Sequence, residues 1–247
     1  MEALKIVGLT KHFGGVYSLQ NVSFNVEAGE RLAIIGPNGA GKTTLFNLLA
    51  GQLSATHGRI FFFGREITSL TPYRRAHLGL ARSFQISNLF FNLTVLDNTL
   101  LAIQATRTES FRMLRSITAY KDLYEKARQL LNSTSLWEKG DALVRNISHG
   151  EQRNLEIVLS LALEPRLLLL DEPTAGLTEA ESTNIFDIMR TLGSDTTVLF
   201  VAHDIDLVLS VANRIIVLHY GEVIADGTPE EIQADSKVKE IYMGIEE

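Results

Sequence analysis

Apolar and polar positions follow two different periods along the chain, and each change of period marks a change of element. Residues 4–9 and 23–26 alternate as antiparallel strands do, and a turn at residues 28–30 leads into the apolar run 31–35. A short loop follows that run, and then come residues 44–49, whose apolar positions have helical spacing. Further strands are predicted at residues 58–64, 167–170, 197–202, 214–218 and 222–225. Strands that alternate with helical segments predict an α/β fold.

The stretch between residues 97 and 146 has no strand pattern. Leu123 and Leu130 are spaced as on one face of a helix, with charged residues between them. A further helix is predicted from Glu151 until Pro165 interrupts it. We therefore expect a helical lobe inserted into an α/β core.

The composition of the chain limits the cellular compartment and the kinds of partner that we expect. The chain has 247 residues, no cysteine and a net charge of −6. The absence of thiols excludes disulfides and thiolate metal sites and fits a reducing compartment. No apolar run approaches the roughly 18 residues of a membrane span, and no secretory signal is expected. We expect a soluble chain that reaches a membrane only through a partner, and the acidic charge argues against broad binding to nucleic acid.

The loop after the buried strand 31–35 carries the clearest chemistry. It has the pattern G-x4-G-K-T, in which three glycines let backbone N–H groups turn inward and the next helix adds positive potential. Such a loop suits a polyphosphate, with Lys42 reaching the β- and γ-phosphates and the Thr43 hydroxyl coordinating Mg²⁺. The loop consists of Gly36, Pro37, Asn38, Gly39, Ala40, Gly41, Lys42 and Thr43, and Thr44 follows in the helix.

Polar residues end two other apolar strands. Asp171 and Glu172 follow a wholly apolar run, and ligands bind at the carboxyl ends of buried parallel strands. Asp171 is placed to hold Mg²⁺ and Glu172 to polarise an attacking water; the alternative is that both merely mark a strand end. His203 ends a similar strand, where we favour a γ-phosphate contact over an ordinary surface histidine.

Three features admit two interpretations each. Phe13, beside two glycines, is either a core aromatic or a platform on which a purine base stacks. Gln85 is either a polar loop residue or one that presents its carbonyl oxygen to a metal or water. The dense apolar residues of segment 86–93 are either core or a patch that awaits a partner.

A second helix start is also suited to an anion. Ser148 is a good N-cap for the helix predicted from Glu151. With Gly150 it also makes a second anion site. One chain with one nucleotide has no evident need of two such sites.

Together these motifs resemble the ATP-binding cassette family, over essentially the whole chain and in the family's order. The resemblance implies one domain over residues 1–247, with a P-loop (RecA-like) core, an antiparallel β subdomain and a helical subdomain at about residues 86–160. It implies an ATPase that uses ATP and Mg²⁺. The segments 83–85, 93–98, 152–157 and 238–244 look most like those of branched-chain amino acid uptake ATPases.

The resemblance also implies a role for each site residue. Glu172, His203 and Gln85 would act in hydrolysis. Thr43, Gln85 and Asp171 would hold Mg²⁺, and Phe13 would stack on adenine. The segment that contains Ser148, Gly150 and Glu151 matches the family's signature, which binds the ATP held by a second subunit. That would explain the surplus anion site.

Two residues depart from the family pattern. His149 stands where the signature usually has glycine, so its φ cannot freely be positive. Thr178 stands where the family has an aspartate with a role between subunits.

The resemblance implies an ATP-hydrolysing subunit that powers a membrane permease, importing branched-chain or related amino acids. Its partners would be integral membrane subunits, a second ATP-binding subunit and an extracytoplasmic solute-binding protein. It would lie at the cytoplasmic face of the inner membrane as a peripheral subunit. We also expect Leu89, Phe90 and Phe91 to line part of a groove for a permease helix. The alternative is a related ATPase that has no membrane partner and acts on nucleic acid or the ribosome.

Overall fold

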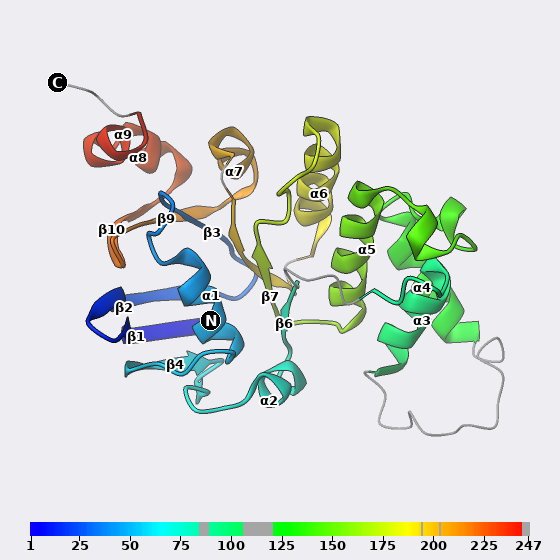
Figure 1. The fold of residues 1–247 in the computed structure, drawn as a ribbon, viewed down its shortest axis with the longest axis horizontal. Coiled ribbons are helices and arrows are strands. Elements are labelled where there is room, and N and C mark those ends of the chain that lie inside the picture. Colours follow the sequence, from blue (N-terminus) through cyan, green and yellow to red (C-terminus); the bar gives the residue numbers. More distant parts are fainter. Residues whose placement is uncertain (84–88, 106–120, 194, 203, 244–247) are drawn as a thin grey trace.

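Two sheets organise the part of the chain that the computed structural model describes, residues 1–83, 89–105, 121–193, 195–202 and 204–243 (Figure 1). The first sheet is antiparallel with the order β2-β1-β4-β5, and the second has the order β10-β9-β3-β8-β7-β6. All neighbours in the second sheet are parallel except β9 and β10. The strands are β1 (Glu2–Phe13), β2 (Val16–Glu27), β3 (Arg31–Ile35), β4 (His57–Phe62), β5 (Arg65–Glu66), β6 (Leu80–Arg82), β7 (Leu167–Asp171), β8 (Thr197–Val201), β9 (Arg214–His219) and β10 (Glu222–Gly227).

The described helices connect and cover these sheets. They are α1 (Lys42–Ala50), α2 (Pro72–His77), α3 (Val95–Ala105), α4 (Lys121–Asn132), α5 (His149–Ala162), α6 (Glu179–Thr191), α7 (Ile205–Val211), α8 (Pro229–Ala234) and α9 (Ser236–Met243), with 3₁₀ turns at Trp137–Lys139 and Val144–Asn146. Helix α1 lies between the two sheets (Figure 1). None of the described helices combines the length and the apolar character that crossing a membrane requires.

The central strands are buried on both faces. In β7, Leu167 and Leu169 pack in the cluster that contains α1, whereas Leu168 and Leu170 pack in the cluster that contains α6. Because successive side chains of a strand point to opposite faces, this split is what a strand covered on both sides requires. The structure confirms the α/β fold and the buried parallel strand predicted from the apolar run at residues 167–170.

Helices α3, α4 and α5 gather at one side of the molecule, away from the antiparallel sheet (Figure 1). Leu123, Ala127 and Leu131 of α4 are buried against α3 and α5. The predicted helical lobe therefore has a core of its own. Its expected boundary at residues 86–160 stays a prediction.

Several element boundaries differ from those predicted. Strand β1 continues to Phe13, beyond the strand predicted at residues 4–9, because the chain turns only at residues 14 and 15. Helix α5 begins at His149 rather than Glu151. The sequence analysis did not predict the short elements α2 and β6, since three to six residues show too little of either period.

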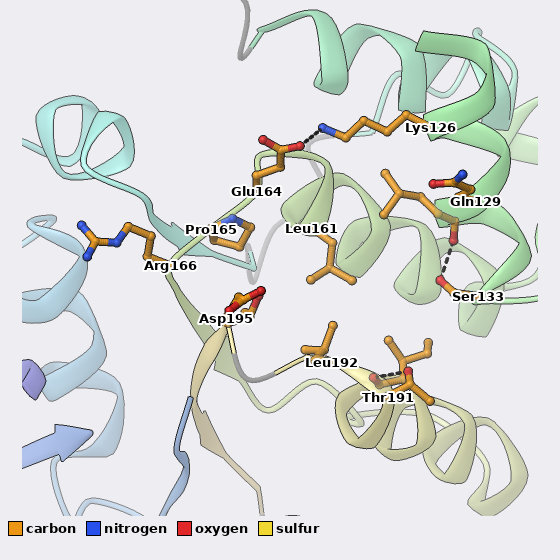
Figure 2. A pocket seen from close by; sticks show the side chains of 13 residues that line it. Lys126, Gln129, Ser133, Leu161, Glu164, Pro165, Arg166, Thr191, Leu192 and Asp195 are labelled. Carbon is orange, nitrogen blue, oxygen red and sulfur yellow. Dashed lines mark hydrogen bonds and ion pairs between the residues drawn. The ribbon is translucent and has the colours of Figure 1, made fainter. Parts of the chain in front are cut away.

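A cavity of about 550 Å³ separates α4 and α5 from the end of α6 (Figure 2). It is lined by Arg166, which precedes β7, and by Thr196, which precedes β8. It therefore lies at the amino edge of these strands, opposite to the edge where a nucleotide is expected.

Candidate functional site

The phosphate loop, residues 36–43, connects β3 to α1 at the carboxyl edge of the parallel strands. Gly41, the N-cap of α1, has φ 104°, a left-handed conformation that glycine adopts without steric cost. A Cβ at Gly36 would overlap the carbonyl oxygen of Leu218 on β9. The loop can follow this path only with glycine at these two positions.

Lys42 points back into the loop. Its Nζ donates hydrogen bonds to the carbonyl oxygens of Gly36 at 2.6 Å and Pro37 at 3.0 Å. Burial lowers the pKa of Lys42, while the nearby Glu172 and Asp171 carboxylates oppose that shift. The ammonium group is thus held inside the loop, where a phosphate could replace the two carbonyl oxygens as its partner.

A cavity of about 180 Å³ joins the phosphate loop to Glu172. Its described lining comprises Ser18, Asn38, Gly39, Ala40, Gly41, Lys42, Thr43, Thr44 and Glu172. Ser18 of β2 pairs its hydroxyl with that of Thr44 at 2.7 Å. The structure therefore brings together the predicted phosphate loop and the predicted hydrolytic carboxylate, and adds Ser18, which the sequence analysis missed.

Asp171 ends β7 with a fully buried side chain. Its Oδ2 accepts a hydrogen bond from Arg82 Nη2 at 2.7 Å in a buried ion pair. Its Oδ1 is buried and has no hydrogen-bond partner among the described residues. Burial raises the pKa of Asp171, and the Arg82 guanidinium partly opposes that shift. An unsatisfied buried carboxylate oxygen is a ready ligand for a hard cation.

Glu172 adopts an unusual backbone conformation. Its φ is 48°, a left-handed value that costs a residue with a Cβ about 1 kcal/mol or more. The N–H of Glu172 donates to the Val201 carbonyl oxygen at 3.0 Å. A residue before proline is further restricted, and Pro173 follows. Such strain persists where the surrounding structure holds it, which is frequent at functional sites.

The signature segment forms the start of α5. Ser148 caps the helix as predicted: its Oγ accepts from the Glu151 N–H at 3.2 Å, and Glu151 Oε2 accepts from the Ser148 N–H at 2.9 Å. Lys139 also donates to Glu151. Residues 148–151 do not belong to the described lining of the phosphate-loop cavity. The predicted second anion site therefore does not line the cavity of the predicted phosphate site in the described part of this chain, although His149 lines a neighbouring cavity with Asp171 and Glu172.

The two departures from the family pattern fit this geometry. His149 is the first residue of α5, where φ is negative in any case, so no glycine is needed there. Thr178 caps α6 in a capping box with Glu181. A Cβ at Gly150 would overlap the Glu181 carboxylate, so α6 and α5 meet at their N-termini.

Phe13 lies at the end of β1 with 51% of its surface exposed. Lys11 Nζ lies 5.0 Å from its ring centroid. An aromatic ring this exposed is not part of the core, so the core interpretation was wrong. Phe13 remains available as a stacking surface.

Gln85 and His203 lie outside the described residues. Ser83, two residues before Gln85, donates its N–H to the Leu169 carbonyl oxygen at 2.9 Å, and Ala202 before His203 is buried. The assignments of Gln85 and His203 therefore stay predictions.

Two arginines in this region were not singled out by the sequence analysis. Arg82 holds Asp171, and it also donates to the side chains of Asn47 and Gln52. Arg153 of α5 contacts the turn after β7. The ion pair of Arg153 could have been predicted from the sequence, because Glu156 lies three residues later on a predicted helix.

Comparison with known proteins identifies relatives over the whole chain. The family described as "ABC transporter" matches residues 19–175, and the family "Branched-chain amino acid ATP-binding cassette transporter" matches residues 222–247. The high-affinity branched-chain amino acid transport ATP-binding protein LivG of Salmonella typhimurium is 36% identical over 98% of this chain and 97% of its own length.

Solved structures agree with this match. The ADP conformation of MJ1267, an ATP-binding cassette of an ABC transporter, is 32% identical with a TM-score of 0.85 and covers 99% of each chain. A dimeric post-hydrolysis state of the cassette MJ0796 bound to ADP and Pi is 27% identical with a TM-score of 0.77, covering 92% of this chain and 98% of that one.

Proposed function

The chain belongs to the ABC transporter family as an ATP-binding subunit and an ATPase, and from this premise we propose that it powers uptake of branched-chain or related amino acids. The observation that carries the substrate class is the LivG relative, which matches along almost its full length, together with the match of residues 222–247. The alternative of a related ATPase acting on nucleic acid or the ribosome is not favoured by these relatives.

We propose that ATP binds with its phosphates in the phosphate loop and its adenine on Phe13. The exposed ring of Phe13 and the inward Lys42 ammonium support these roles. Mg²⁺ would bind next to these phosphates, because Thr43 lines the cavity and the buried Asp171 Oδ1 beside Glu172 has no hydrogen-bond partner among the described residues. Thr43, Asp171 and Gln85 would hold the ion, which supplies charge neutralisation on the phosphates.

Glu172 is proposed as the group that orients and activates the attacking water. It lines the cavity that contains Lys42, so its side chain lies beside the place where the γ-phosphate would bind. Gln85 and His203 would complete the hydrolytic set. The Lys42 ammonium would stabilise the negative charge that develops on the phosphate oxygens during hydrolysis.

Two copies of an ATP-binding subunit would act together. The start of α5, with Ser148, Gly150 and Glu151, stands apart from the phosphate-loop cavity of its own chain. The positive end of a capped helix suits an anion, and the phosphate would come from the ATP of the partner subunit. An identical chain and a related chain both satisfy this geometry as the second copy.

The membrane partner would dock at a groove beside the helical lobe. This groove, of about 160 Å³, is lined by Arg82, Leu89, Ala102, Glu156, Leu159, Ser160 and Leu163. Leu89 lines this groove, but it is only 6% exposed and packs in the core of the lobe, whereas Phe90 and Phe91 are not among its described lining residues. Phe90 and Phe91 are 60% and 41% exposed and remain candidates for contact with a permease helix.

Co-purification and uptake together test this proposal. We expect the chain to purify with integral membrane subunits, and loss of the chain to abolish ATP-dependent uptake of leucine, isoleucine and valine while a solute-binding protein still binds them. The chain would then be a peripheral subunit at the cytoplasmic face of the inner membrane. Unchanged uptake of all three amino acids, with lost uptake of a different small solute, would contradict the substrate class.

A further inference from the structure

The Arg153 side chain of α5 donates hydrogen bonds to the backbone of the turn that carries Glu172. Arg153 Nε donates to the Pro173 carbonyl oxygen at 3.1 Å, and its Nη2 donates to those of Glu172 at 3.1 Å and Asp171 at 3.3 Å. Three consecutive backbone carbonyls thus share one guanidinium. The planar fork of arginine, with five N–H donors, is suited to such a set.

Arg153 is itself held in place. Its Nη1 donates to Glu156 Oε2 at 2.6 Å, one helical turn further along α5. The two side chains are 13% and 8% exposed, so this ion pair is largely removed from water. The ion pair and the burial therefore restrict both side chains, and both belong to α5.

The backbone conformation of Glu172 is disfavoured and is stabilised by hydrogen bonds on both sides of this residue. Its left-handed φ of 48° before a proline is disfavoured for a residue with a Cβ. On the amino side, the Glu172 N–H is fixed to Val201 of β8. On the carboxyl side, Arg153 of α5 donates to the carbonyl oxygens of Glu172 and Pro173.

We propose that Arg153, held by Glu156, is a positioning residue that makes the alignment of Glu172 depend on the position of α5. This inference rests on the proposed function, in which the start of α5 binds the nucleotide of the partner subunit. Ser148 caps that start, and Arg153 follows within the first two turns. Occupation of one ATP site would therefore adjust the hydrolytic glutamate of the other.

Arg153→Met, Arg153→Lys and the control Arg128→Met test the proposal in the purified subunit. Arg128 lies on α4, half exposed, 3.9 Å from Glu125. We expect Arg153→Met to slow single-turnover ATP hydrolysis by roughly 10- to 100-fold, the scale of a misplaced catalytic group. ATP affinity should stay within about two-fold. Arg153→Lys should recover part of the rate with an unchanged melting temperature, and Arg128→Met should match the wild type.

A double variant separates positioning from general damage. Because Arg153 acts through Glu172, adding Arg153→Met to Glu172→Gln should slow the residual hydrolysis no further. The proposal is overturned if both Arg153 variants hydrolyse ATP at the wild-type rate, if their loss only follows the unfolded fraction, or if the double variant shows the product of the two losses. A Glu172→Gln variant as fast as the wild type would instead overturn the proposed role of Glu172.

Discussion

At the scale of single residues, the role proposed for Glu172 predicts that ATP hydrolysis can be lost while ATP binding is kept. Glu172→Gln leaves Lys42 and Asp171 in place, so we expect unchanged ATP affinity, hydrolysis slower by about 10²-fold or more, and an ATP-bound dimer that accumulates. Phosphate release and size-exclusion chromatography with ATP measure both effects. Turnover near the wild-type rate would show that another group activates the water.

Phe13 offers a second residue-scale prediction. Because its ring is exposed, Phe13→Ala should weaken ATP binding by about 1–3 kcal/mol and leave the melting temperature nearly unchanged. Tyr73→Ala, an exposed aromatic on α2, is the matched control and should change neither. Titration of a fluorescent ATP analogue against GTP and CTP measures the loss of purine preference. Unchanged affinity for all three nucleotides would contradict stacking.

The roles of residues within one short motif could be predicted from the sequence. Roles that depend on contacts between residues distant in sequence could not. The phosphate loop has its strand, glycines and lysine within one short segment, so its pattern was sufficient. The partner of Asp171 is Arg82, which the pairing of β6 with β7 brings to it from 89 positions away. No periodicity in the sequence marks such a pair.

At the scale of elements, a buried arginine caps the C-terminal end of helix α1. Arg75 is 1% exposed and donates to the carbonyl oxygens of Leu48 and Leu49 at the end of α1, and of Thr68 and Leu70. Burial lowers its pKa to about 10, so it still carries its charge at neutral pH. The Leu48 carbonyl also accepts from the Gly51 N–H, so Arg75 adds a second donor there and supplies a donor to the Leu49, Thr68 and Leu70 carbonyls.

Arg75→Met should therefore destabilise the fold by at least about 3 kcal/mol, since several buried carbonyls lose their donor. For a chain of this size that corresponds to a melting temperature lower by roughly 6–12 °C. Arg74→Met, at the exposed neighbouring position, is the control and should have little effect. Equal melting temperatures for the two variants would show that the carbonyls find other partners.

The capping box of α5 makes a pH-dependent contribution. Burial of Glu151 would raise its pKa, but the hydrogen bonds and charge of Lys139 and Ser148 outweigh this, so the pKa is lowered. A carboxyl group with a lowered folded-state pKa stabilises the fold above its unfolded pKa, and the stabilisation is lost as pH falls through the folded value. Glu151→Gln should thus melt below the wild type at neutral pH.

The same difference should shrink as the pH is lowered below the ordinary glutamate range. Exposed Glu138→Gln is the control. Thermal melts of the three proteins across the acid range measure the effect. A difference between Glu151→Gln and wild type that is independent of pH would show that the cap works without its charge.

Elements differed in how far the sequence could predict them. The apolar runs of β3, β7 and β8 are buried on both faces, so composition alone marked them. Strand β6 has only three residues, and it is a strand because β7 offers a free edge beside it. Its existence is a property of the sheet, which a local pattern does not contain.

At the scale of the whole molecule, the groove and the hydrolytic site share two ion pairs. Arg82 lines the groove and holds Asp171, and Glu156 lines the groove and holds Arg153, which grips the Glu172 turn. A permease side chain that enters the groove would touch residues one contact away from both carboxylates. If the permease docks there as proposed, these two ion pairs would provide a short physical path between the docked permease and the proposed hydrolytic site.

The last prediction tests whether the groove is a docking surface or only part of the lobe. Leu163 lines the groove and is 40% exposed, so Leu163→Asp should place an unpaired charge in an apolar contact while the isolated subunit folds and hydrolyses ATP. We expect co-purification with the membrane subunits to fall by roughly ten-fold or more. Phe90 is exposed as well, and Phe90→Asp should also lower co-purification with the membrane subunits where the permease contact includes this residue.

Leu89→Asp provides the opposite case, because Leu89 packs inside the lobe. This variant should lose melting temperature, ATPase activity and assembly together. Co-purification, ATPase rate and melting temperature measured on all three variants decide the matter. A Leu163→Asp subunit that still assembles normally, or one that loses stability as Leu89→Asp does, would show that the permease docks elsewhere.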